Sequence, residues 1–359
     1  CGFGIVDKET RIADIHATTA TEDKSLKIVT GKLKLDDHPV LEKIFEGYEK
    51  QEEYHPVLRG KEISDYYEVM NPQVEFPDFS DDEVQYGYYF YFKEGGVFAW
   101  NDKKFTANEL EIFRRYTSVL SLTYRRFIDL KEAEAQAREA QIEAALERVR
   151  AKSMAMHKSD ELADLSFELV KQVQALGIST WFCAFNIYDD DPKGSLEWGS
   201  NAQGTYEEYR TPREGIFLRY YEAGQRGETL LVNEIGEDEC PRHYEYLCSL
   251  PGVGEQLLQM KEAGIPFPTS QIDHVAFLKY GYIIFITFEP ALEAHNIFIR
   301  FAKVFEQTYT RFLDLQKAEA QTREAKVEAA LERVRSLALG MRASEEAGDV
   351  TDRLFKELT

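Results

Sequence analysis

The sequence predicts an α+β protein in which two similar globular domains, each an antiparallel sheet flanked by helices, are joined by long coiled-coil-like helices. The first observation is an internal repeat. Thr123–Arg150 and Thr308–Arg335 are identical at 21 of 28 positions, at a constant offset of 185 residues. Self-similarity at a fixed spacing indicates a duplicated unit. The second observation is a series of short apolar runs separated by turn residues before each copy, which is typical of antiparallel strands.

The composition is that of a globular protein with two or three domains. The 359 residues are 43% hydrophobic and 13% aromatic, and the net charge of −21 argues against nucleic acid or anionic membrane as partners. No stretch has the apolar length of a membrane span. The cysteines Cys1, Cys183, Cys240 and Cys248 follow no disulfide-framework spacing. We therefore expect a reducing, cytoplasmic location.

The first domain is expected at residues 1–105. Alternation and turn residues predict strands at Gly2–Asp7, Arg11–Thr18, His55–Leu58, Tyr86–Phe92 and Val97–Trp100, and helices at Pro39–Lys50 and Lys61–Met70. The stretch Asn71–Glu83 is expected to be loop. Because CGFGIVD at Cys1–Asp7 aligns with CAFNIYD at Cys183–Asp189, we expect Cys1 to lie inside a strand of a domain truncated at its start.

A long helix is expected at 106–158, since Asp129–Arg150 contains no Gly or Pro and consists mainly of strong helix formers. Thr106 and Glu109 form a capping box, and we expect a break near His157–Ser159. Apolar residues seven apart predict a parallel dimer seam. The predicted seam consists of Ile128, Ala135, Ile142, Leu146, Val149, Met156, Val327 and Val334. A solvated single linker helix is the alternative interpretation.

The second domain is expected at 159–290, the second long helix at 291–342 and the start of a further unit at 343–359. Predicted helices are Asp160–Leu176, Pro212–Ala223 and Arg242–Gly264, the last interrupted at Pro251–Gly254; predicted strands are Thr180–Tyr188, Ser195–Gly199, Thr229–Asn233, His274–Phe277 and Tyr282–Phe288. Gly177 is expected to end the first of these helices.

The end of the first domain, FAWNDKKFTANELEIFRRYTSVLSLTYRRFIDL, resembles the end of a GAF domain. In that family a core strand leads through an Asn/Lys segment into a helix that starts Phe-Thr-x-x-Asp/Glu, and Asn101, Lys103, Phe105, Thr106 and Glu109 occupy these positions. The motif EAQIEAALERVR, followed by a Ser-Asp-Glu-Leu helix, is similar to the helices that join tandem sensory modules in bacterial sensor histidine kinases and related cyclase-linked regulators. The resemblance covers essentially the whole chain.

Aromatic side chains of the second domain form the expected ligand pocket between sheet and helices: Phe182, Trp198, Tyr220, Tyr244, Phe277 and Tyr282. A packed core without a ligand is the alternative, because large aromatic residues also fill cores.

Cys240, His243 and Cys248 are the residues considered for a metal site. Zinc takes four ligands and this segment offers three, so burial of small apolar thiols is the expectation. His157 is a candidate phosphoacceptor, because such histidines lie on dimeric helices. No ATP-binding motif accompanies it, so we expect a surface residue near a helix break.

The resemblance implies a sensory or regulatory region of a signal-transduction protein, a sensor histidine kinase, that relays ligand or dimer state through helical connectors. No catalytic residue is predicted, and kinase activity would reside beyond Thr359 in a parent chain. The expected partners are a second copy, through the long helices, and a small-molecule ligand; the sequence identifies no cofactor. Two alternatives stay open: a dimerisation scaffold that binds no ligand, and a thiol redox enzyme that uses Cys240 and Cys248.

Overall fold

The computed structural model describes residues 1–20, 26–74, 76, 79, 82–158, 161–340, 351 and 355, without the side chains of 20, 337, 338 and 340. Two antiparallel sheets and helices, two of them long, confirm the α+β class. The chain divides into two compact units, unit 1 at Cys1–Gln136 and unit 2 at Ala137–Thr359. The division falls inside helix α3, Ala107–Met154. Each unit therefore contains part of that helix.

Unit 1 is a six-stranded sheet in the order β3-β2-β1-β6-β5-β4. Its strands are β1 (Gly2–Asp7), β2 (Ile12–Ala20), β3 (Leu26–Lys34), β4 (Val57–Arg59), β5 (Val84–Phe92) and β6 (Gly95–Asn101). Helices α1 (Pro39–Lys50) and α2 (Lys61–Met70) share a hydrophobic cluster with one face of this sheet. The start of α3 packs on the other face, where Phe113 stacks on Phe90 at 5.8 Å.

Unit 2 repeats this topology in the order β10-β8-β7-β13-β12-β11, with the short β9 paired to β8. Its strands are β7 (Thr180–Tyr188), β8 (Gly194–Asn201), β9 (Gly204–Thr205), β10 (Tyr209–Pro212), β11 (Leu230–Ile235), β12 (Gln271–Leu278) and β13 (Gly281–Thr287). Strand for strand, β10, β8, β7, β13, β12 and β11 correspond to β3, β2, β1, β6, β5 and β4. The two globular parts therefore share one fold.

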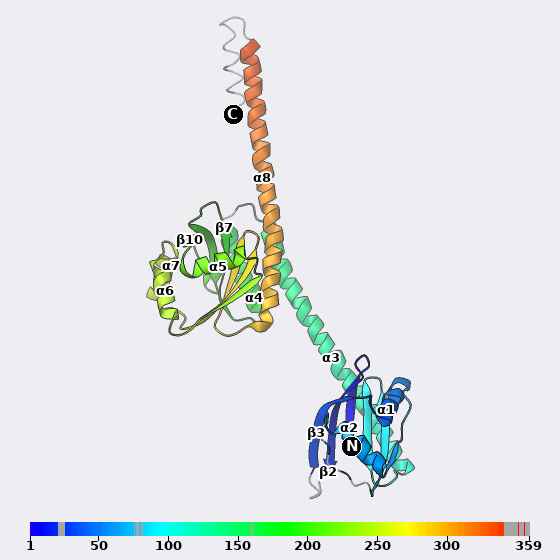
Figure 1. Ribbon diagram of the computed structural model, residues 1–359. Helices are drawn as coiled ribbons and strands as arrows, with labels where there is room; N and C mark the ends of the chain where they lie inside the picture. The colour runs from blue at the N-terminus through cyan, green and yellow to red at the C-terminus, as the bar shows by residue number, and fades with distance from the viewer. Residues whose placement is uncertain are drawn as a thin grey trace. The chain divides into compact units, whose positions relative to one another are not determined.

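Helices cover both faces of the unit 2 sheet (Figure 1). One face packs against α5 (Gly215–Gln225), α6 (Cys240–Ser249) and α7 (Val253–Glu262). The other packs against α4 (Leu162–Ala175), the end of α3 and the first half of α8 (His295–Gly340), which follows the 3₁₀ turn Leu292–Ala294. Because side chains alternate along a strand, β7 places Phe182 and Ala184 in the first core and Cys183 and Phe185 in the second.

Two predicted helix signals are confirmed. At the start of α3 the Glu109 carboxylate accepts a 2.6 Å hydrogen bond from the Thr106 amide, and Thr106 Oγ1 accepts one of 3.3 Å from the Glu109 amide. These bonds lower the pKa of Glu109. After α4, Gly177 has φ +77°, the left-handed conformation that ends a helix.

Three strands differ from the sequence prediction. The sequence does not predict β3, because Lys27, Lys32 and Lys34 interrupt its apolar pattern and it lies at a sheet edge. β10 and β9 were not predicted either, and the helix expected from Pro212 starts at Gly215 because Pro212 pairs with Gly194 in the sheet. The predicted helix break at Ser159 and the predicted helix start at Asp160 lie outside the described residues. Of the further unit expected at 343–359, the structure describes residues 351 and 355 alone.

Half of the predicted dimer seam lies inside unit 2 of its own chain. Ile142, Leu146, Val149 and Met156 are buried in one hydrophobic cluster with α4 and α8. Intrachain packing therefore accounts for their sevenfold spacing. The other four predicted seam residues, Ile128, Ala135, Val327 and Val334, are exposed or half-buried. None of the described helices has both the length and the apolar character that crossing a bilayer requires.

Candidate functional site

A cavity of about 60 Å³ lies in unit 2 between the sheet and helices α5, α6 and α7. Its walls are mainly apolar and aromatic, and two carboxyl groups face into it. The lining includes Phe182, Tyr206, Ile216, Leu257, Ile284 and Ile286 together with Glu197 and Asp273. Because an unpaired charge in such surroundings is strongly disfavoured, these two acids are the features that need explanation.

Glu197 comes from the middle of β8 and is buried. The Tyr209 hydroxyl donates to one carboxylate oxygen at 2.5 Å, and Asn186 Nδ2 donates to the other at 2.8 Å. Burial raises the pKa of Glu197, these two hydrogen bonds oppose the rise, and the charge of nearby Asp273 adds to it.

Asp273 comes from β12 and is also buried. The Tyr220 hydroxyl donates to it at 2.5 Å, and Gln271 Nε2 donates at 2.7 Å. Burial raises the pKa of Asp273 to about 6 in spite of both bonds. Gln271 in turn accepts a 2.7 Å bond from the Tyr244 hydroxyl, so strands and helices meet in one polar network at the cavity.

A wider, open cleft of about 840 Å³ adjoins this cavity at α6 and α7. Tyr244 lines both spaces and stacks on Phe267 at 4.8 Å. The Tyr244 side chain is therefore part of the wall that the two spaces share.

Of the six aromatic residues predicted to form a ligand pocket, three line the cavity: Phe182, Tyr220 and Tyr244. Phe277 and Tyr282 pack in the same cluster but away from the cavity wall. Trp198 is corrected: it packs on the opposite face of the sheet, because it follows Glu197 in the strand and side chains alternate. The sequence reasoning missed the two acids. Their signal was an acidic residue inside an apolar strand, in SLEWGS and in QIDHVAF.

The three residues considered for a metal site do not form one. Among the residues that the structure describes, no group of three or more His, Cys, Asp or Glu side chains is arranged to hold a metal ion. Cys240 is buried and donates to the Pro268 carbonyl at 3.3 Å. Burial raises the pKa of Cys240 and of Cys248, which keeps both thiols protonated and poorly nucleophilic. His243 lines the cavity, and burial lowers its pKa to about 4. His157 is exposed.

Unit 1 has a cavity of about 50 Å³ in the corresponding position, between its sheet and helices α1 and α2. Its wall is apolar apart from five tyrosines and Trp100, and the Tyr89 hydroxyl accepts a 3.0 Å bond from Trp100 Nε1. None of the described residues that line it is charged. The two units therefore share a cavity position but differ in the chemistry at that position.

The wall of the unit 2 cavity carries two carboxyl groups and one imidazole, from Glu197, Asp273 and His243. Its described wall combines apolar surface with two carboxyl groups and several hydroxyl and amide groups, and it includes no Ser, Thr, Cys or Lys. Compared with known protein families and with curated proteins, the chain matches none.

Proposed function

We propose that this chain is the sensory region of a signal-transduction protein and that unit 2 binds a small organic cation between Glu197 and Asp273. The observation that carries this proposal is the pair of buried carboxyl groups on the wall of one apolar cavity. Each charge disfavours the other, so the second acid resists ionisation when the cavity holds no cation. A cation would reverse that balance by stabilising both ionised forms. Few polar groups on an apolar wall are typical of small-ligand sites.

A GAF-like module fits both units. The same strand order in both sheets supports a duplicated module, and the Asn101–Glu109 segment that resembles the family leads from β6 into α3. The histidine kinase that such a region would control is inferred from the resemblance alone.

Strand β12 supplies a route from the cavity to the long helix α8. Asp273 faces the cavity, and the next residue, His274, points to the opposite side of the sheet. There the His274 ring lies 5.1 Å from the ring of His295 and 5.2 Å from that of Phe298, both in the first turns of α8. A shift of β12 on ligand binding would therefore act directly on the start of α8. The relay needs two packings of this junction that differ little in free energy.

The test compares acetamidinium with acetamide, a pair of equal shape that differs in charge. Above pH 7 acetamidinium is expected to raise the melting temperature of unit 2, and acetamide is not. Four heavy atoms limit the binding free energy to about −6 kcal/mol, so the dissociation constant should be no tighter than tens of micromolar. An excess of 100-fold over that constant would stabilise unit 2 by about 2.7 kcal/mol. Equal shifts from both compounds, or none, would favour the ligand-free scaffold.

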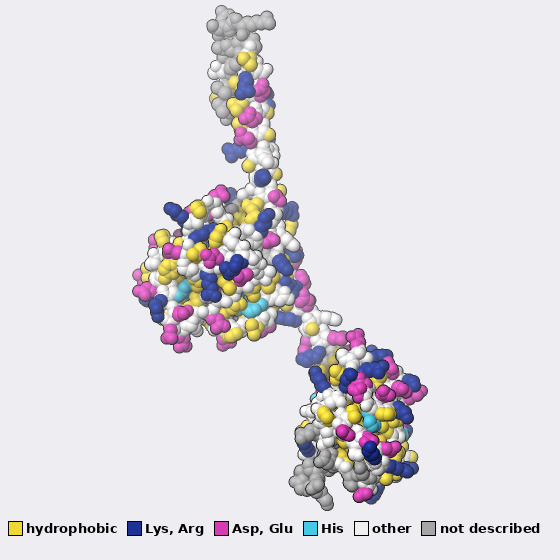
Figure 2. All heavy atoms as spheres, viewed as in Figure 1, with side chains coloured by type: hydrophobic (Ala, Val, Ile, Leu, Met, Phe, Trp, Pro, Cys, Tyr) yellow, Lys and Arg dark blue, Asp and Glu magenta, His cyan; other side chains and the backbone are white. Residues whose placement is uncertain are grey.

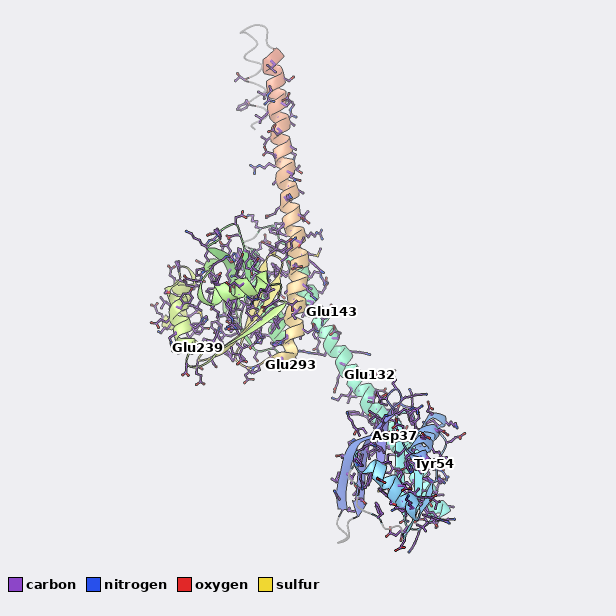
Figure 3. The ribbon with its side chains drawn as sticks, viewed as in Figure 1. Asp37, Tyr54, Glu132, Glu143, Glu239 and Glu293 are labelled. Carbon is purple, nitrogen blue, oxygen red and sulfur yellow. The ribbon has the colours of Figure 1, made fainter. Side chains whose placement is uncertain are left out.

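We also propose that two copies of the chain form a parallel dimer along the stretch of α3 around Glu132, which is labelled in Figure 3. Ile128 and Ala135 are the seam residues of this stretch, and Ala135 is exposed. In a background without Cys1 and Cys248, Ala135→Cys is expected to form an interchain disulfide under mild oxidation. Ala133→Cys is the matched control, since this equally exposed alanine lies about 200° around the helix. Equal cross-linking at both positions would contradict a parallel seam.

A further inference from the structure

The wall of the unit 2 cavity is made largely of aromatic rings. Trp181, Phe182, Tyr206 and Tyr244, which we call the aromatic box, line it together with aromatic side chains of β10 and α5. The ring planes of Trp181 and Tyr244 lie at 82° to each other, with their centroids 6.2 Å apart. Those of Phe182 and Tyr206 also lie at 82°, at 5.4 Å. Several aromatic rings set at steep angles around one small space are the arrangement of the aromatic cages that hold methylated cations.

The tyrosine hydroxyls of this wall already have partners in the protein. Each of the four donates a hydrogen bond of 2.8 Å or less to a protein acceptor. The four pairs are Tyr206 with Met260 Sδ, Tyr209 with Glu197, Tyr220 with Asp273 and Tyr244 with Gln271. Within the described wall, no tyrosine hydroxyl is therefore left to donate to a ligand.

The two carboxyl groups are hydrogen-bonded as well, but no cation balances their charge. Each of the four carboxylate oxygens of Glu197 and Asp273 accepts a bond from the protein. Neither Lys nor Arg lines the described wall, and burial lowers the pKa of His243 to about 4, so its imidazole is neutral at pH 7. On the visible surface of unit 2, by contrast, Lys and Arg side chains lie among the acidic ones (Figure 2). The cavity thus offers negative charge and aromatic surface.

Unit 1 has lost both acids at the same positions of its sheet. When the glycines that open β13 and β6 are aligned, the strand pairing places Ile15 at the position of Glu197 and Gly87 at the position of Asp273. The cavity of unit 1 nevertheless keeps an aromatic wall. The acids of unit 2 are therefore not required to form a cavity in this fold, and unit 1 serves as an internal control.

The wall of unit 2 distinguishes between kinds of cation. A cation that enters the cavity loses its water, so every N–H group of an ammonium or amidinium ion needs a new acceptor. The carboxylate oxygens that could accept such bonds are already bonded to the protein. A methylated ammonium ion leaves no N–H group unpaired, its methyl groups contact apolar surface, and its charge is attracted by ring faces as well as by carboxylates. The wall therefore favours a cation that makes no hydrogen bonds.

We propose that the ligand of unit 2 carries a methylated ammonium group, enclosed by the aromatic box and balanced by the carboxyl pair of Glu197 and Asp273. This inference rests on the cation site of the proposed function and narrows its ligand class. The rival within that class is a primary ammonium or an amidinium ion that bonds directly to the carboxylate oxygens.

Isothermal titration calorimetry of the full chain at pH 8 tests the ligand class with four compounds. Tetramethylammonium is expected to bind about tenfold more tightly than methylammonium or acetamidinium, because the rings attract its charge and its methyl groups need no acceptor. tert-Butanol, a neutral molecule of nearly the same shape as tetramethylammonium, is expected not to bind measurably. The stoichiometry should be one tetramethylammonium per chain, since unit 1 lacks both acids.

A pair of variants tests the aromatic box. Phe182→Leu removes one ring and keeps an apolar side chain, so it should reduce the preference for tetramethylammonium over methylammonium by about threefold or more. Phe277→Leu is the matched control and should leave the preference unchanged, because Phe277 belongs to the same hydrophobic cluster but does not line the cavity. The preference is a ratio of two affinities in one protein, so it does not depend on the fraction of chains that fold.

The outcomes separate this inference from the proposed function. If methylammonium or acetamidinium binds at least as tightly as tetramethylammonium, and tert-butanol does not bind, the cation site stands and the methylated class is wrong. If tert-butanol binds as tightly as tetramethylammonium, or if no compound binds, both proposals are wrong. A preference for tetramethylammonium that Phe182→Leu leaves intact would also overturn the inference, since the aromatic box would then play no part.

Discussion

Replacing Asp273 by asparagine is expected to raise the free energy of unfolding of unit 2 at pH 8 by about 1–3 kcal/mol. Burial raises the pKa of Asp273 from 3.8 to about 6, so at pH 8 the folded protein holds an ionised carboxylate that burial disfavours. A difference of roughly 2 pKa units corresponds to about 3 kcal/mol. Asparagine has nearly the same shape, remains neutral and can still accept the bond from Tyr220. It loses the bond from Gln271 Nε2, because its amide group replaces the second acceptor oxygen, so the expected gain is below the full value of about 3 kcal/mol.

The pH dependence of this gain follows from linkage. Because the folded pKa lies above the unfolded one, the contribution of Asp273 is most favourable below pH 4 and is lost as the pH rises through 6. The raised pKa of Glu197 acts in the same direction. His243 and His274 act in the opposite direction, since burial lowers the pKa of each to about 4. The difference between variant and parent should therefore be near zero at pH 4 and largest above pH 7.

Urea unfolding with Trp100→Phe in both proteins would report on unit 2, whose tryptophans are Trp181 and Trp198. The exposed acid Glu245, replaced by glutamine, is the control and should change little. The Asp273→Asn protein should also lose its response to acetamidinium, because one of the two anionic partners is gone. Gained stability with lost binding is the usual sign of a functional buried charge. A variant less stable than its parent at pH 8 would contradict this account of the cavity.

The fold class and most elements could be predicted because they depend on local pattern. Strand β7 and helices α1 and α2 agree with their predicted bounds, since apolar spacing and turn residues specify them. The sequence does not predict the edge strands β3 and β10, because an edge strand is partly exposed to solvent and its alternation of apolar and polar residues is weak or interrupted. Glu197 and Asp273 were not predicted because the expected pocket was based on aromatic residues alone. Aromatic residues fill packed cores as often as they line ligand pockets.

The sevenfold apolar pattern shows why a seam is harder to assign than a helix. The spacing identifies the side of α3 that is buried. It does not distinguish burial against a second copy from burial in the chain's own core, because both surfaces are apolar. In Ile142–Val149 the covering surface belongs to α4 and α8 of the same chain.

Phe301→Ala is expected to destabilise unit 2 by about 3–5 kcal/mol, the range for removing a large buried aromatic side chain. Phe301 is fully buried in the hydrophobic cluster that includes Ile142 and Val149 of α3, and its ring lies 6.4 Å from that of Phe285. The repeat provides a matched control, Tyr116→Ala, at the equivalent position of unit 1. Tyr116 is largely exposed, so this change should alter the stability of unit 1 by no more than about 0.5 kcal/mol in dilute solution.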